Sequence, residues 1–307
     1  MIVVAALFLF ACSNQPTGMK EPTDNATSGE VRVMVDESYR ELFEMQIYTF
    51  ESIYGNAKIR AGYLPESEAL SRLINDSCKV VVISRDLTPS ERKTFESNNL
   101  FPISTKIAED AVAVIVNNEN PDSVLSVEDI KSALLGKDSL WKSFNPKTAL
   151  GTINLVFDNK GSGNIRYMQD TLLGGKQFSK NVFAVNSNLE VIDYVSKHPG
   201  AMGFIGVSWI SDMDDPRVQE RLKQVKVLAI SKDLQKDPEG VKPEQAHIKT
   251  KDYAFSRSVY MINRQTRAGL GMGFVSFVAG EKGQLMMLKA GLVPGFPPER
   301  TIKVNLE

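Results

Sequence analysis

Short apolar runs alternate with amphipathic segments along most of the chain. In residues 31–83, apolar and polar side chains first alternate as in a strand, and apolar positions then recur at helical spacing to Phe50. The same order of strand and helix continues to residue 83, which predicts a β-α-β-α-β unit. Further strands are predicted at 110–117, 152–157, 203–207, 225–230 and 258–262; helices at 165–173, 188–197 and 271–288 and from a capping-box pattern at Ser126; and a polar surface segment at 231–252. The alternation predicts an α/β fold with largely parallel sheets.

The first residues have the pattern of a secretory leader. The apolar run from Ile2 to Ala11 is too short to span a bilayer and fits the hydrophobic region of a signal peptide, although no Lys or Arg precedes it. Its end, Leu9-Phe10-Ala11-Cys12, resembles the lipobox of bacterial lipoproteins, whose cysteine is acylated and becomes the mature N-terminus. We therefore predict lipidation of Cys12 and a flexible tether, so that residues 1–29 precede the folded body. The alternative is a secreted protein in which this cysteine is incidental.

Composition and motifs argue against several other classes of protein. The formal net charge of -1 gives no general attraction to nucleic acid. With Cys12 lipidated, Cys78 is the one remaining thiol, and its place before an apolar run predicts that it is buried and inert. His198 and His247 lack metal-ligand spacing, and the chain contains no GxSxG, HExxH or Walker A pattern. We therefore expect no metal, no cofactor and no enzymatic activity.

The strand at 152–157 leads into the best candidate for a binding loop, Gly161-Ser162-Gly163-Asn164. The glycines permit positive φ and close approach of a ligand, and Ser162 and Asn164 offer side-chain donors beside the free N–H groups of a new helix. The alternative is an ordinary tight turn capped by Ser or Asn, and the pattern alone does not separate the two. Asp158, four residues before the serine, places a negative charge beside this loop.

Three other strand ends carry candidate ligand-binding side chains. Ser84 and Arg85 follow the third strand, at the edge of the sheet where the ligands of open α/β folds collect. Arg85 suits a bidentate bond to an oxyanion, or alternatively a salt bridge to a nearby acid. Glu37 and Ser38 follow the first strand and Ser67 follows the second, and each serine is either a ligand residue or a helix N-cap.

These motifs, in this order, resemble the periplasmic phosphate-binding proteins of ABC importers. The resemblance runs from residue 31 to residue 294 and implies a type II periplasmic-binding-protein fold, in which two lobes, each a mostly parallel sheet flanked by helices, are joined by two hinge crossings. It also implies capture of a solute in the cleft between the lobes and its delivery to permease subunits in the membrane. The landmarks are KVVVISRDLTPSE (79–91), EDAVAVIVNNENP (109–121), LSVEDIKSALLGKDSLW (125–141), VFDNKGSGNIRYM (156–168), NSNLEVIDYVSKHPGAMGFIGVSWI (186–210), DYAFSRSVYMIN (252–263) and FVAGEKGQLMMLKAGLVP (277–294).

The resemblance also implies where the lobes begin and end. By position, the two crossings fall near residues 107–111 and 252–256. Lobe one would comprise residues 30–108 together with 254–307, and lobe two residues 109–253. With the lipobox, this implies a monomer that is lipid-anchored in the bacterial periplasm or at the cell surface.

The chain departs from the family pattern at the charged residues of the site. The family's loop has an arginine, three residues and then Ser-Gly-Thr, whereas this chain has Asp158 at the place of the arginine. Phosphate binders often carry Ser-Asp after the third strand, and this chain has Arg85 at the place of the aspartate. The two charges have changed places. The residues that we expect to bind the ligand are Glu37, Ser38, Ser67, Ser84, Arg85, Asp158, Ser162, Gly163 and Asn164.

Two interpretations of this exchange remain open. In the first, Arg85 supplies the guanidinium, Asp158 pairs with it or accepts the ligand's proton, and the cleft closes on phosphate or a related oxyanion, our leading ligand. In the second, the excess of carboxylates disfavours a dianion and receives a zwitterionic or cationic solute instead. A sensory or interaction lipoprotein with a degenerate cleft is a further alternative, and a phosphatase-like enzyme has no nucleophile or metal cluster to support it. The carboxylates near the cleft are Asp36, Glu37, Glu66, Glu68 and Asp158.

Overall fold

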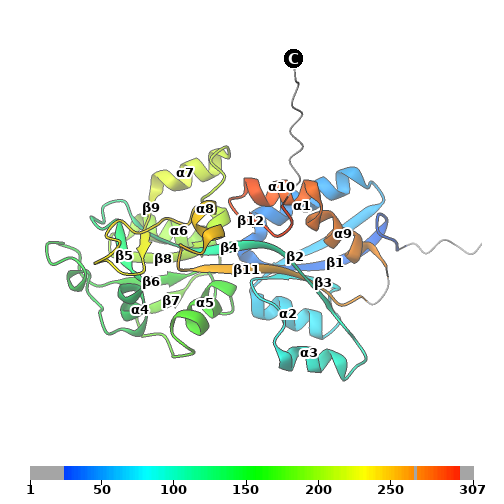
Figure 1. Ribbon diagram of the computed structural model, residues 1–307, viewed down its shortest axis with the longest axis horizontal. Helices are drawn as coiled ribbons and strands as arrows, with labels where there is room; N and C mark the ends of the chain where they lie inside the picture. Colours follow the sequence, from blue (N-terminus) through cyan, green and yellow to red (C-terminus); the bar gives the residue numbers. More distant parts are fainter. Residues whose placement is uncertain (1–23, 266–267, 298–307) are drawn as a thin grey trace, which may run out of the picture.

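A computed structural model describes residues 24–265 and 268–297, and the predicted lipidation site, Cys12, lies outside them. The described chain forms an α/β structure in which one continuous curled sheet lies between two layers of helices (Figure 1). The strand order is β2-β1-β3-β11-β4-β8-β6-β7, with β12 and β9 also paired to β4, and β5 and β10 form a small separate sheet. The α/β class predicted from the sequence is confirmed.

The strands coincide with the apolar runs of the sequence. All four residues of β3 are buried, as expected of an inner strand covered on both faces. β1 pairs in parallel with β2 and β3, and β6 pairs in parallel with β7 and β8. The strands are β1 (Gly29–Asp36), β2 (Ala57–Leu64), β3 (Val80–Ile83), β4 (Ile103–Asn117), β5 (Val124–Ser126), β6 (Asn154–Phe157), β7 (Val182–Ala184), β8 (Ala201–Gly206), β9 (Val225–Val227), β10 (Ala229–Ser231), β11 (Ser256–Asn263) and β12 (Val293–Pro294).

The long strand β4 joins the two halves of the sheet. Its residues 103–111 pair antiparallel with β11, and its residues 112–116 pair antiparallel with β8. We call β2, β1, β3, β11 and the start of β4 the first half, and the end of β4 with β8, β6, β7 and β9 the second half. The expected crossing near 107–111 lies on β4 at this junction, and the one near 252–256 lies at the start of β11. The lobe boundaries at 108 and 254 stay predictions.

Helices cover both faces of each half (Figure 1). In the first half α1, α9 and α10 lie on one face and α2 and α3 on the other, while in the second half α6 and α7 lie opposite α4 and α5. The helices are α1 (Arg40–Ile53), α2 (Glu66–Ile74), α3 (Pro89–Glu96), α4 (Val127–Leu135), α5 (Gly163–Tyr167), α6 (Asn188–Lys197), α7 (Pro216–Gln224), α8 (Gln245–Thr250), α9 (Leu270–Ala279) and α10 (Glu281–Lys289), with the 3-10 turns η1 (Glu37–Tyr39), η2 (Trp141–Ser143) and η4 (Val207–Trp209) and the π-helical turn η3 (Met168–Leu172).

Local sequence signals and the core agree in fixing these elements. The predicted capping box opens α4, where the Ser126 hydroxyl accepts a hydrogen bond from the Asp129 N–H at 3.0 Å, and the helix ends at Gly136, whose φ is 71°. Between α1 and α9, the Phe50 ring packs edge-on against Phe274 at 5.3 Å between centroids. The first contact fixes the start of α4 in the second half, and the second joins two helices that cover the first half.

The structure differs from the predicted elements in a few segments. The predicted helix at 165–173 is the short α5 followed by η3, and the helical segment at 271–288 is divided at Gly280 into α9 and α10. The polar segment 231–252 contains α8. The helices α3 and α7 were not predicted, because they contain few apolar residues and so lack a periodic signal.

A buried ion pair lies at the junction of the two halves. On β11, Nε of Arg257 donates to Oδ2 of Asp110 on β4 at 2.9 Å, and neither side chain is more than 1% exposed. The Tyr39 hydroxyl donates to the same oxygen at 3.0 Å. The ion pair therefore joins β11 to β4, and the bond from Tyr39 joins both strands to η1, the turn that follows β1.

We expect Arg257→Met to lower the free energy of unfolding by about 3 to 5 kcal/mol, because it leaves the Asp110 carboxylate buried without its cation. Urea unfolding followed by circular dichroism measures this loss. Arg60→Met is the matched control, since Arg60 pairs with Glu30 on the exposed surface, and it should leave stability unchanged. Equal stability of the two variants would contradict the structural role of Arg257.

Candidate functional site

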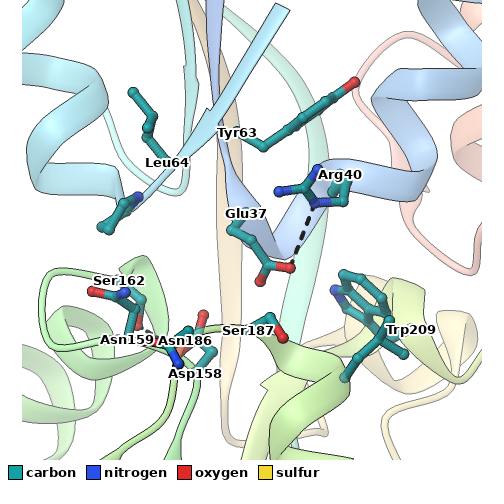
Figure 2. Close-up of a pocket in the computed structure, with 12 residues that line it drawn as sticks. Glu37, Arg40, Tyr63, Leu64, Asp158, Asn159, Ser162, Asn186, Ser187 and Trp209 are labelled. Carbon is teal, nitrogen blue, oxygen red and sulfur yellow. Dashed lines mark hydrogen bonds and ion pairs between the residues drawn. The ribbon is translucent and has the colours of Figure 1, made fainter.

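A pocket of about 270 Å³ opens between the two halves of the molecule. In Figure 2, Tyr63, Leu64, Glu37 and Arg40 form the wall from the first half, and the residues around Asp158 form the wall from the second. The Arg40 guanidinium lies 4.4 Å from the centre of the Tyr63 ring, and its Nε is 3.8 Å from the Glu37 carboxylate. The lining residues are Glu37, Arg40, Tyr63, Leu64, Pro65, Asp158, Asn159, Ser162, Asn186, Ser187, Leu189 and Trp209.

The predicted binding loop lies at the floor of this pocket, between β6 and α5. The Ser162 hydroxyl caps α5 by accepting from the Ile165 N–H at 3.2 Å and donates to Oδ1 of Asp158 at 2.6 Å. Asn164 is fully buried, and its Oδ1 has no hydrogen-bond partner among the described residues. The helix-capping interpretation of Ser162 is therefore correct, and a contact of its hydroxyl with a ligand stays a prediction.

Asp158 is fully buried and connects the two halves. Its Oδ2 accepts from the Ser38 hydroxyl at 3.4 Å and from Nδ2 of Asn188 at 3.3 Å. Burial raises the pKa of Asp158, and the hydrogen bond from Ser162 opposes this rise. The expected ion pair between Asp158 and Arg85 is not formed in this structure, since hydroxyl and amide donors surround the carboxylate instead.

Asp36 at the end of β1 is bound by main-chain donors from both halves. Its Oδ1 accepts from the Ser38 N–H at 2.9 Å, and its Oδ2 accepts from the Gly163 N–H at 3.1 Å. Burial raises the pKa of Asp36 to about 7, with further rises from Glu66 and Asp158 and an opposing effect of Arg257. The loop predicted to bind an anion thus does bind a carboxylate, and that carboxylate belongs to the chain.

Glu37 makes a second link across the cleft. Its Oε2 accepts from the backbone N–H of Asn188 at 3.2 Å and from Nδ2 of the same residue at 2.6 Å. Burial raises the pKa of Glu37 to about 7, although the two hydrogen bonds from Asn188 oppose this. The Asn188 carbonyl oxygen Oδ1 in turn accepts from the Gly206 N–H at 3.0 Å, which fixes the orientation of its amide.

Glu66 at the start of α2 makes the third link. It accepts from the Ser84 N–H at 2.8 Å and the Ser84 hydroxyl at 2.5 Å, and it forms an ion pair with Arg166 of α5. Burial alone would raise the pKa of Glu66, yet Arg166 and Ser84 outweigh it and hold the pKa of Glu66 below its usual range. Arg166, not Arg85, is therefore the guanidinium that crosses the cleft.

The structure places Arg85 and Ser67 away from the open pocket. Both terminal nitrogens of Arg85 donate to the Glu91 carboxylate, at 2.7 and 2.8 Å, so the salt-bridge alternative describes its present contacts. The Ser67 N–H donates to the Gly161 carbonyl at 3.1 Å, so Ser67 touches the loop through its backbone. A ligand contact by either residue stays a prediction.

Sequence reasoning did not assign five residues of the site. Asp36 and Glu66 were counted only as acids near the cleft, and Arg166, Asn188 and Trp209 were not singled out. Nε1 of Trp209 donates to the Ser38 carbonyl at 2.8 Å. Two features of the sequence could have indicated Asn188 and Arg166. Each lies in a helix that follows a strand, and ligands of open α/β sheets bind at the carboxyl ends of the strands.

No group of three or more His, Cys, Asp or Glu side chains suited to a metal ion occurs among residues 24–265 and 268–297. Within the same residues, no helix combines the length and apolarity that crossing a membrane requires. The site therefore offers hydrogen-bond donors and carboxylates as its chemical groups.

The two acids with raised pKa values predict how stability depends on pH. An acid whose pKa is higher in the folded chain than in the unfolded chain holds its proton more tightly when folded. Stability from Asp36 and Glu37 is therefore full below about pH 4 and is lost as the pH rises through about 7. We expect the melting temperature to fall from about pH 5 to about pH 8, and to fall less in the double variant Asp36→Asn, Glu37→Gln. A melting temperature that rises over this range in the wild type would contradict these assignments.

Comparisons with known proteins agree with the fold. The chain is 27% identical over 261 residues to the phosphate-binding protein PstS of Staphylococcus aureus (strain USA300), an alignment that covers 83% of this chain and 74% of the relative. A candidate phosphate ABC transporter substrate-binding protein from Clostridium perfringens, solved with bound phosphate, matches with a TM-score of 0.72 at 21% identity and covers 87% of this chain and 99% of that one. An ABC-type phosphate transport receptor from Vibrio cholerae matches with a TM-score of 0.65 at 19% identity, over 87% and 100% of the two chains.

These solved structures share the fold, and the curated relative extends the similarity to the sequence. The model of one family, described as a PBP superfamily domain, matches residues 20–282, which is most of the chain. The arrangement of two layers of helices on one curled sheet is consistent with that match. The chain therefore belongs to the PBP superfamily.

Proposed function

We propose that this chain is an extracytoplasmic solute-binding lipoprotein of an ABC importer and that it captures phosphate or a related oxyanion in the cleft. The observation that carries the proposal is the convergence of donors from both halves on one anionic group. The Ser38 N–H from the first half and the Gly163 N–H from the second meet at the Asp36 carboxylate, 2.9 and 3.1 Å away. Donors so placed suit the oxygen atoms of an oxyanion.

Relatives that are named for phosphate binding and phosphate transport support the same proposal. In it, the solute draws the two halves together, and the loaded protein is presented to permease subunits in the membrane. Lipidation at Cys12, a monomeric state and a place in the periplasm or at the cell surface belong to this proposal. So does the absence of any turnover by the chain itself, since its relatives are named as binding and transport proteins.

The carboxylates of the pocket favour an oxyanion that still carries a proton. Glu37 and Asp158 line the pocket, and a protonated oxyanion can donate to a carboxylate where a fully ionised one meets only repulsion. Arg40 at the pocket wall supplies a cation for the remaining charge. The site as built therefore suits phosphate better than sulfate.

Thermal unfolding of the full chain with and without phosphate tests this function at fixed ionic strength. Phosphate at about 100 times its dissociation constant should stabilise the protein by about 2.7 kcal/mol, and sulfate should give no comparable shift. Equal shifts of the unfolding temperature with phosphate and sulfate would contradict the idea that the cleft selects an anion that carries a proton. No shift with either anion would sink the phosphate proposal.

A second candidate, a zwitterionic solute, is favoured by one feature of the pocket. Glu37 and Arg40 present opposite charges 3.8 Å apart beside the Tyr63 ring. Amino acids, which carry both charges, belong in the same thermal screen. Stabilisation by an amino acid without stabilisation by phosphate would favour this candidate, and no response to any solute would favour a sensory or interaction role.

The two arginines near the site should differ in their effect on binding. Arg166→Met should weaken phosphate binding by about 1.5 to 3 kcal/mol, because it removes the cation that pairs with Glu66 across the cleft and leaves Glu66 only the longer ion pair with Arg85, at 3.6 Å. Arg85→Met is the comparison variant, because Arg85 binds Glu91 at 2.7 Å and lies farther from Glu66, at 3.6 Å, so that its loss should affect binding less. Titration calorimetry measures both affinities. A larger loss in Arg85→Met would restore Arg85 as the guanidinium that binds the ligand.

A further inference from the structure

The main-chain donors of the cleft are already occupied by a group of the chain itself. Asp36 is fully buried, and each of its two oxygen atoms accepts an N–H from a different half of the molecule. Glu66 likewise occupies the Ser84 N–H and hydroxyl from within the first half and pairs with Arg166 of the second. In this arrangement, carboxylates make the contacts that a bound oxyanion would make.

The space above the loop excludes a second anion. A Cβ atom built on Gly163 would lie 2.4 Å from the Ser84 hydroxyl oxygen, 2.6 Å from Oδ2 of Asp36 and 2.8 Å from Oε2 of Glu66. A single methyl group therefore does not fit, and a tetrahedral oxyanion is larger. The Gly163 N–H already donates to Asp36 at 3.1 Å, so a solute that takes this donor would displace the Asp36 carboxylate.

We infer that Asp36 is an internal ligand of the cleft and that it sets the affinity of the cleft for its solute. This inference rests on the proposed function. The Asp36 carboxylate competes with the solute for the Ser38 and Gly163 N–H groups. It also holds the two halves in contact when no solute is bound. The solute binds only to molecules in which Asp36 has left these donors, so its apparent affinity is reduced by the fraction of molecules in that state.

General charge repulsion is the alternative explanation for weak anion binding, and a neighbouring residue separates the two. Glu37 carries the same charge in the same cleft, yet it bonds to Asn188 and not to the Gly163 N–H. Removal of either charge relieves repulsion equally. Only a change at Asp36 frees the Gly163 N–H of the second half.

The test compares Asp36→Ala and Glu37→Gln with the wild type, using the full chain dialysed free of phosphate. Phosphate affinity is measured by titration calorimetry, and the radius of gyration without phosphate by small-angle X-ray scattering. We expect Asp36→Ala to bind phosphate about tenfold tighter than the wild type and to have a larger radius of gyration. Glu37→Gln should gain no affinity and should keep the wild-type radius, because the amide oxygen of Gln can still accept from the Asn188 N–H.

Two further variants keep the comparison interpretable. Asp36→Asn retains one acceptor oxygen and should lie between wild type and Asp36→Ala in both measurements, and it carries the test if Asp36→Ala does not fold. Glu128→Gln removes a carboxylate from the exposed first turn of α4 and should match the wild type.

The outcomes separate this inference from the proposed function. Equal affinity gains in Asp36→Ala and Glu37→Gln, with no change in radius, would show general repulsion and overturn the inference. Wild-type affinity and radius in Asp36→Ala would also overturn it while leaving phosphate binding intact. A larger radius in Asp36→Ala with no phosphate binding in any variant would uphold the internal ligand and reject phosphate as the solute.

Discussion

The burial of several carboxylates at one place is the constraint on which the cleft depends. Asp36, Asp110 and Asp158 are each fully buried, and a buried carboxylate is stable only where donors or cations replace its water. Arg257 provides the cation beneath them, through its bonds to Asp110 and its field at Asp36. Two further donors come from the opposite half of the molecule, the Gly163 N–H to Asp36 and the Ser38 hydroxyl to Asp158. The relative position of the two halves is therefore set by polar geometry across the cleft as well as by the strand β4 that joins them.

This constraint explains how the exchange of charges is accommodated. Asp158 does not need Arg85, because the Ser162 hydroxyl and the Asn188 amide satisfy its two oxygens. Arg85 does not need Asp158, because Glu91 receives it bidentately. The cation that pairs with Glu66 from across the cleft is Arg166, four residues after Ser162 in α5. The site keeps a guanidinium but brings it from another position of the chain.

The sequence was sufficient for the fold and for the loop, and insufficient for the partners within the site. The strand at Val80–Ile83 and the capping box at Ser126 are local signals, and both elements form where those signals predict. The pairing of Asp36 with Gly163 joins residues 127 positions apart, so no local pattern contains it. Arg85 was assigned to the ligand from its position after a strand. Its actual partner, Glu91, lies in α3, a helix with too few apolar residues to be predicted, so the pairing was not foreseen. The sequence does not show which polar side chains pair with each other in the site, because tertiary contacts decide those pairings.

The order of the residues from solvent inward suggests how such a cleft would discriminate. A solute meets Arg40 and Glu37 at the pocket wall before it reaches the donors beneath Asp36. Because these charges are opposite, neither a simple cation nor a fully ionised anion is favoured at the entrance, whereas a protonated oxyanion can accept from Arg40 and donate to Glu37. Deeper binding then requires the Asp36 carboxylate to leave the Gly163 N–H, and protonation of Asp36 weakens its hold on that donor. Since burial raises the pKa of Asp36 to about 7, its ionised and protonated forms would both be populated near neutral pH, and in the proposed mechanism the protonated form would release the Gly163 N–H to the solute more readily.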